Sequence, residues 1–155
     1  LAAARHRLEM PTPRVDLGLA LRGIASAAAD VSDGLIGDLG HILEESALGA
    51  SLNLDAAINL LAAHAYFSGD AERFAHEVGM DRALQCVLGG GDDYELVFTA
   101  APEQRAAVAA AASACDVPIT RIGVIEQAPG LRLRNASGLI VDHRIAAFDH
   151  FAATS

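Results

Sequence analysis

The sequence predicts a single α/β domain of the layered α+β kind, in which helices pack against a mixed sheet. Segments of strand-like composition alternate with segments of helical periodicity, and such alternation is typical of layered domains. The length of 155 residues suits one compact domain and is too short for two ordinary ones. Hydrophobic residues make up 52% of the chain and aromatic residues only 5%. Many of the others are alanine, which favours closely packed helices.

Two prolines mark the segment before the predicted domain. Pro11 and Pro13 fix an extended connection and exclude a helix through this stretch. Residues 1–15 are therefore interpreted as a linker or the end of a preceding domain, and residues 16–155 as the domain itself.

The elements of the domain are predicted from hydrophobic spacing and from turn residues. Apolar residues recur at i, i+4, i+7 and i+8 from Leu35, which predicts a helix from Asp33 to about Ala47, with Gly49 as its stop. In chain order, the predicted elements are a helix capped by Asp16 and ending at Gly23, a strand at 24–30, the helix after Asp33, a strand at 50–54, a helix capped by Asp55, an irregular helical excursion at 68–85, a strand with Tyr94, Leu96 and Phe98 on one face, a helix from Pro102 to about 114, and strands at 119–126 and 131–134.

The charge of the chain narrows the classes of partner. Eleven basic residues against 20 acidic ones give a formal net charge of -9, which argues against nucleic-acid binding. All 11 basic residues are arginine, so neither a P-loop lysine nor a Schiff-base lysine is present. No stretch reaches the ~20 apolar residues of a membrane span, and no targeting signal is recognisable. We therefore expect a soluble cytoplasmic protein with reduced cysteines.

Residues 30–34 combine two carboxylates, a hydroxyl and a glycine at the predicted change from strand to helix. Paired carboxylates bind hard cations such as Mg²⁺, and helix N-termini bind anions. Asp30 and Asp33, with Ser32 between them, could therefore begin a metal-bridged phosphate site. The alternative is that Ser32 or Asp33 is an N-cap and that Asp30 is solvated. Spacing alone favours this alternative, because capping is so common.

A second informative stretch runs through Gly89, Gly90 and Gly91 into a predicted strand. Glycines allow the backbone to approach a ligand closely, but the phasing of a dinucleotide-binding loop is absent, so a tight turn is an equal alternative. Glu95 is expected beside this loop, where it could bind a cationic ligand, and Phe148 could stack on a flat ring. A solvated strand face and a core aromatic are the respective alternatives.

Four motifs follow one another along the chain. They are Pro-x-Pro-Arg-Val at 11–15, Asp-Val-Ser-Asp-Gly-Leu at 30–35 with Asp-Leu at 38–39, Gly-Gly-Asp-Asp-Tyr-Glu-Leu at 90–96, and Phe-Asp-His-Phe at 148–151. In this order they resemble the C-terminal half of the thiamine-monophosphate kinase family, over nearly the whole chain. The wider group includes aminoimidazole ribonucleotide synthetase and selenophosphate synthetase. The resemblance therefore implies the C-terminal domain of the aminoimidazole ribonucleotide synthetase-like fold.

This resemblance implies ATP-dependent and Mg²⁺-dependent phosphorylation of thiamine monophosphate to thiamine diphosphate. By similarity, Asp30 and Asp33 would hold Mg²⁺, Ser32 would contact ATP, and Glu95 and Phe148 would hold the thiamine part. The N-terminal half of that family carries most of the nucleotide site and the main dimer surface. The full-length protein is therefore expected to be a homodimer, and this chain alone is expected to lack kinase activity.

Two alternatives to this function are kept. One is a related ATP-dependent synthetase of the same superfamily, of the aminoimidazole ribonucleotide or selenophosphate type, acting on another substrate. The other is a binding module that retains the fold without the chemistry. The presence of Asp30, Asp33 and Glu95 argues against the second alternative.

Overall fold

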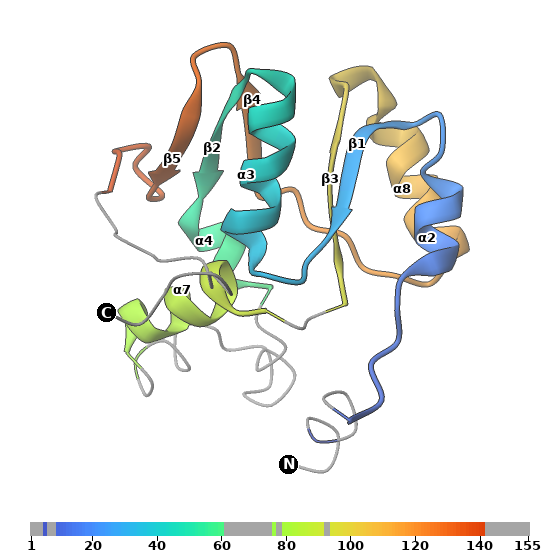
Figure 1. Cartoon of the computed structure of the whole chain (residues 1–155), viewed down its shortest axis with the longest axis horizontal. Helices are drawn as coiled ribbons and strands as arrows, with labels where there is room; N and C mark the ends of the chain where they lie inside the picture. The colour runs from blue at the N-terminus through green and yellow to red at the C-terminus, as the bar shows by residue number, and fades with distance from the viewer. Residues whose placement is uncertain (1–4, 6–8, 61–75, 77–78, 92–93, 142–155) are drawn as a thin grey trace.

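The computed structural model describes residues 5, 9–60, 76, 79–91 and 94–141, and the elements follow the predicted order (Figure 1). They are α2 (Val15–Ala20), β1 (Ala25–Asp30), α3 (Leu35–Ser46), β2 (Gly49–Asn53), α4 (Leu54–Ile58), α7 (Met80–Gly89), β3 (Leu96–Ala100), the short 3-10 helix η1 (Pro102–Gln104), α8 (Arg105–Ala114), β4 (Gly123–Glu126) and β5 (Gly130–Arg134). The predicted α+β class is confirmed. The predicted domain boundary after residue 15 stays a prediction.

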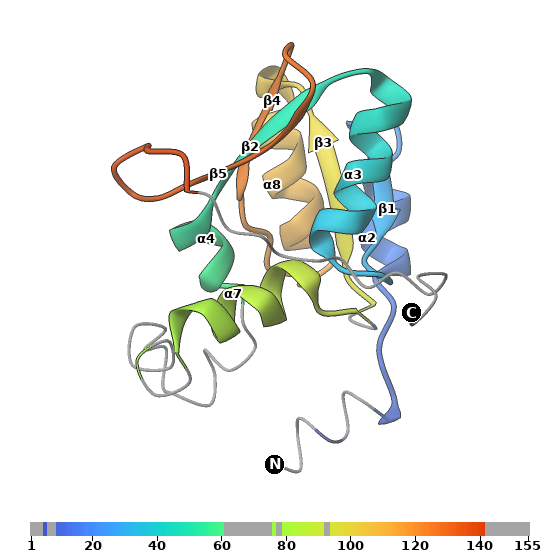
Figure 2. The same cartoon turned by 60° about the vertical axis from the view of Figure 1, so that its left-hand side comes forward.

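The described strands form two small sheets. β1 and β3 pair in antiparallel orientation, with Asp30 opposite Leu96. In the other sheet β2 is central, with β4 antiparallel on one side and β5 parallel on the other, so this sheet is mixed as predicted. In both Figure 1 and Figure 2, α7 lies across the lower end of the domain, beneath the strands. It thus lies close to the point where β1 gives way to α3.

Two hydrophobic clusters lie on opposite faces of the β1–β3 pair. The larger joins α3, α4 and α7 to the mixed sheet, and Val97 of β3 packs into it. The smaller joins α2 to α8, and the neighbours of Val97, Leu96 and Phe98, pack against it. Side chains alternate between the faces of a strand, so β3 contributes to both clusters. Leu84 and Leu88 of α7 are the largest fully buried side chains among the described residues.

The predicted end of α3, at about Ala47, is confirmed, but the residue predicted to stop the helix was wrong. The left-handed residue that ends the helix is Ala47, with φ 52°, rather than Gly49. Gly49 belongs to β2, where a Cβ atom would overlap the carbonyl oxygens of Ala128 and Gly130. Glycine is therefore needed at this position for sheet packing and not for the helix stop.

Other predicted boundaries were also wrong. The N-cap of α4 is Asn53, whose side chain accepts a hydrogen bond from the Ala56 nitrogen at 2.9 Å, and not Asp55. Tyr94 lies before β3, is exposed and has φ 54°, so it does not share a strand face with Leu96. The strand predicted from residue 119 begins at Gly123. The predicted excursion at 68–85 lies largely outside the described residues, but its last part belongs to the continuous helix α7.

None of the helices in the described part of the chain combines the length and the hydrophobicity needed to cross a membrane. The two cysteines are free; Cys86 is exposed and Cys115, which follows α8, is partly buried.

Candidate functional site

The two stretches that sequence analysis singled out meet backbone to backbone. A Cβ atom at Gly91 would overlap the carbonyl oxygen of Ser32. A Cβ atom at Gly34 would lie 3.0–3.1 Å from backbone atoms of Gly89, and Gly34 also has φ 106°, which favours glycine. The glycine loop (residues 89–91) thus makes a close backbone approach to the acidic loop (residues 30–34), whereas its predicted approach to a ligand stays a prediction.

The acidic loop joins the end of β1 to the start of α3. Asp30 is the last residue of β1 and is exposed, Ser32 is exposed, and Asp33 is half-buried. The N-cap of α3 is Gly34, so the alternative that Ser32 or Asp33 is the N-cap is wrong. The N-cap residue itself forms no side-chain hydrogen bond to the helix. The positive end of the α3 dipole therefore lies next to Asp33, the residue before the N-cap.

Sequence analysis missed the role of Asp38, which lies in the first turn of α3. Its side-chain Oδ2 accepts hydrogen bonds from the backbone nitrogen of Ser32 at 2.9 Å and of Asp33 at 3.1 Å. Asp38 is buried on a helix face whose other buried residues are leucines. An acid among leucines at helical spacing was the available signal, because such a side chain needs internal hydrogen-bond donors.

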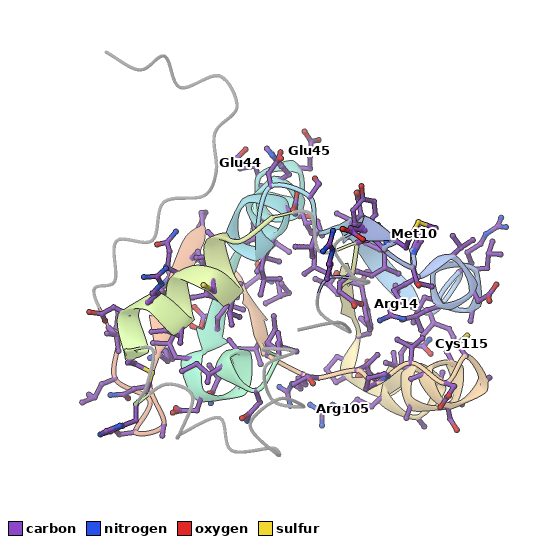
Figure 3. The ribbon with its side chains drawn as sticks, turned by 90° about the horizontal axis from the view of Figure 1, so that it is seen from below. Met10, Arg14, Glu44, Glu45, Arg105 and Cys115 are labelled. Carbon is purple, nitrogen blue, oxygen red and sulfur yellow. The ribbon has the colours of Figure 1, made fainter. Side chains whose placement is uncertain are left out.

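Arg14 is the second residue whose role was missed. Its Nε donates to Glu95 Oε2 and its Nη2 to Glu95 Oε1, both at 2.9 Å. The hydrogen bond to Glu95 and its charge raise the pKa of Arg14, outweighing the opposite effect of burial. Figure 3 shows Arg14 on the α2 side of the domain, whereas Glu44 and Glu45 point outward from α3.

Glu95 lies directly before β3, and not within the strand as predicted, and it is close to the acidic loop. Its backbone oxygen accepts a hydrogen bond from the Val31 nitrogen at 2.9 Å. Its side chain is 39% exposed, against 22% for Arg14. The bidentate ion pair with Arg14 thus fixes the orientation of the Glu95 carboxylate beside the acidic loop and offsets its negative charge. Phe148, the other expected substrate residue, lies outside the described residues.

The acidic loop carries oxygen donors of a kind that suits a metal ion. In the described ranges, no group of three or more His, Cys, Asp or Glu residues could hold a metal ion. Asp30 and Asp33 are hard oxygen donors of the kind that Mg²⁺ prefers, and Mg²⁺ usually keeps several waters and binds substrate phosphates through its remaining positions. The chemistry of these donors fits Mg²⁺. Two carboxylates, however, provide only part of the ligands that a Mg²⁺ ion needs.

A separate polar cluster spans the mixed sheet. Ser51 Oγ donates to Glu126 Oε1 at 2.6 Å, Arg134 Nε donates to Ser51 Oγ at 3.0 Å, and Arg132 lies 3.3 Å from the other Glu126 oxygen. Each member contacts a residue of another strand of this sheet. The cluster therefore cross-links β4, β2 and β5 and is assigned to stability.

Comparisons with known proteins identify the family of the chain. Residues 3–135 match the family described as AIR synthase related protein, C-terminal domain. The chain is 40% identical over 143 residues to thiamine-monophosphate kinase of Salmonella typhimurium, covering 92% of this chain and 40% of that protein. The crystal structure of thiamine-monophosphate kinase from Stenotrophomonas maltophilia K279a is 47% identical, with a TM-score of 0.70, covering 84% of this chain and 38% of that chain. The structure of AaThiL complexed with AMPPCP and TMP has a TM-score of 0.68 at 25% identity, covering 97% and 41%. The chain thus spans about 40% of the length of the first of these relatives.

Proposed function

Because the chain belongs to the family of AIR synthase related proteins, as their C-terminal domain, we propose that it is the C-terminal part of a thiamine-monophosphate kinase. The whole enzyme transfers a phosphoryl group from ATP to thiamine monophosphate and forms thiamine diphosphate. The relatives that match most of this chain support the proposal, and one of them was solved with AMPPCP and TMP. The observation that carries it is the contact between the acidic loop and the glycine loop.

In this proposal the acidic loop binds the metal and the nucleotide. Asp30 and Asp33 hold Mg²⁺, and Ser32, which is exposed between them, contacts ATP. When bound, Mg²⁺ supplies positive charge that neutralises the phosphate oxygens during transfer. The start of α3 adds backbone N–H groups that favour an anion. Direct transfer between two phosphates needs positioning and charge neutralisation, so the absence of lysine from the chain is no obstacle.

Glu95 and Phe148 bind the thiamine part. The thiazolium ring is a permanent cation, which suits a carboxylate and an aromatic face. The two hydrogen bonds from Arg14 hold the orientation of the Glu95 carboxylate, which is partly exposed, for such a contact.

The remaining features of the proposal concern the whole protein. The part outside this chain contributes further metal ligands, most of the nucleotide site and the dimer surface. The full-length protein is then a cytoplasmic homodimer that depends on Mg²⁺, and this chain alone has no kinase activity.

The test uses the full-length protein with ATP, Mg²⁺ and thiamine monophosphate, and measures thiamine diphosphate by chromatography. Asp33→Asn should lower kcat by about 100-fold or more, because it removes about 3 kcal/mol of charge stabilisation with the metal. The matched control is Asp55→Asn, which alters an exposed acid in the first turn of α4 and should leave kcat unchanged.

Several outcomes would contradict the proposal. Failure of the wild-type protein to form thiamine diphosphate rejects the kinase activity, and turnover of aminoimidazole precursors instead would identify a related synthetase. Equal rates for Asp33→Asn and wild type would reject the metal role of this residue. Robust turnover by the isolated chain would reject the proposal that the active site needs residues from outside this chain.

A further inference from the structure

Asp38 is a buried carboxylate whose loss of contact with water must be offset by hydrogen bonds. Its residue is 6% exposed, and its neighbours on the same face of α3 include Leu35 and Leu39. Burying a carboxylate costs free energy unless hydrogen-bond donors replace the lost water. Asp38 has two such donors, the backbone nitrogens of Ser32 and Asp33. The carboxylate therefore ties the first turn of α3 to the acidic loop from the inside.

The backbone of the acidic loop is held from three directions. Val31 donates to the backbone oxygen of Glu95, and the next two nitrogens of the loop donate to Asp38. On the remaining side, Gly91 approaches the carbonyl oxygen of Ser32 so closely that no side chain fits. The Ser32 side chain stays exposed and the Asp33 side chain half-exposed. The loop backbone is thus fixed while polar side chains remain accessible.

We propose that Asp38 is a positioning residue, which sets the placement of the Asp33 carboxylate and the Ser32 hydroxyl for the metal and the nucleotide. The identity of these ligands rests on the proposed function. Asp38 acts through the loop backbone, because both hydrogen bonds of its Oδ2 go to loop nitrogens and the residue is almost inaccessible to solvent. Displacing a ligand side chain by about 1 Å can lower a rate or an affinity by about 100-fold.

The test compares two changes on the same helix in the full-length protein. Asp38→Asn keeps the size of the side chain and removes its charge, which weakens the bonds to the two loop nitrogens. Ile42→Ala, one turn further along α3, removes a side chain that packs against the larger hydrophobic cluster, so it lowers the midpoint of thermal unfolding without altering a loop hydrogen bond. Ile42→Ala therefore controls for a general loss of stability.

Two measurements on these variants decide the role of Asp38. Amide hydrogen exchange at Ser32 and Asp33 should accelerate by about tenfold or more in Asp38→Asn and not in Ile42→Ala. Binding of Mn²⁺, used as a paramagnetic probe for Mg²⁺ in the presence of AMPPCP, should weaken by about tenfold or more in Asp38→Asn only.

The proposal is overturned if Mn²⁺ binds Asp38→Asn as tightly as wild type, if Ile42→Ala weakens it equally, or if the wild-type protein binds no Mn²⁺. Accelerated exchange with unchanged Mn²⁺ binding also overturns it, since Asp38 would then serve stability alone. If Asp38→Asn does not fold, Asp38→Glu decides, because it keeps the charge and shifts the loop by one methylene. Asp38→Glu should weaken Mn²⁺ binding by about threefold or more, and unchanged binding would reject the proposal.

The test also separates this inference from the proposed function. A wild-type protein that binds Mn²⁺ with AMPPCP but forms no thiamine diphosphate refutes the kinase function and leaves this inference standing.

Discussion

The contact between the glycine loop and the acidic loop predicts a large cost for a single methyl group at residue 91. A Cβ atom there would overlap the Ser32 carbonyl oxygen, and this is a backbone atom whose residue is anchored to Asp38 through its nitrogen. The loop therefore cannot move aside without breaking a hydrogen bond. Overpacking of this kind costs about 1–3 kcal/mol. In a domain of this size about 2 kcal/mol corresponds to a fall of roughly 4–8 °C in the thermal midpoint, which we expect for Gly91→Ala.

Gly40→Ala is the matched control, since the same atom is added where there is room for it. Gly40 lies within α3, and a Cβ atom there would have no other atom within 4 Å. Alanine in a helix interior is favoured over glycine by about 0.5–1 kcal/mol, so this variant should unfold at a higher temperature than wild type. Circular dichroism of the chain during heating measures both midpoints. A wild-type midpoint for Gly91→Ala alongside a raised midpoint for Gly40→Ala would refute the close approach.

Two further stability predictions follow from side-chain contacts. A double-mutant cycle with Arg14→Ala and Glu95→Ala should give a coupling energy of about 1 kcal/mol that falls with added salt, because both side chains are partly exposed. A coupling energy of zero would argue against the ion pair. Because the pKa of Arg14 is raised, its charge and this coupling persist from neutral pH upward and are lost only in strong alkali. Asn53→Ala should lower the free energy of unfolding by about 1 kcal/mol, because it removes the cap of α4. Urea titration measures this loss of unfolding free energy. Asp55→Ala is expected to cause a smaller loss, and equal losses for the two variants would contradict the assignment of Asn53 as the cap.

Local patterns explain why the order of the elements could be predicted. The apolar spacing from Leu35 lies within one helix, and Pro102 opens the short 3-10 helix that leads into α8, so both could be recognised without knowledge of distant residues. The residue that stops α3 could not be predicted in this way. Glycine is the residue type typical of a helix stop. The role of Gly49 is nevertheless set by the carbonyl oxygens of Ala128 and Gly130, about 80 positions away in the sequence.

The candidate site shows the same division between local and long-range information. The carboxylates of the acidic loop and the three glycines at 89–91 could be selected from composition, but the contact between the two loops joins residues that lie far apart in the sequence. The pairing of Arg14 with Glu95 spans 81 positions and has no periodicity that would reveal it. The role of Asp38 was within reach of sequence analysis. A lone acid on a leucine face at a helix start needs donors, and the nearest ones are the backbone nitrogens of the preceding loop.

The structure separates the ordering of the acidic loop from the completion of its ligand set. Within the described residues, the loop backbone is held by Asp38, by the backbone of Glu95 and by the glycine loop. The described residues nevertheless bring together no three metal-binding side chains. A site ordered before its ligands arrive loses little conformational entropy when they bind, so affinity depends on the number of donors that the rest of the protein adds. Under the proposed function, this chain supplies an ordered platform for two carboxylates, and further donors from the rest of the enzyme complete the site.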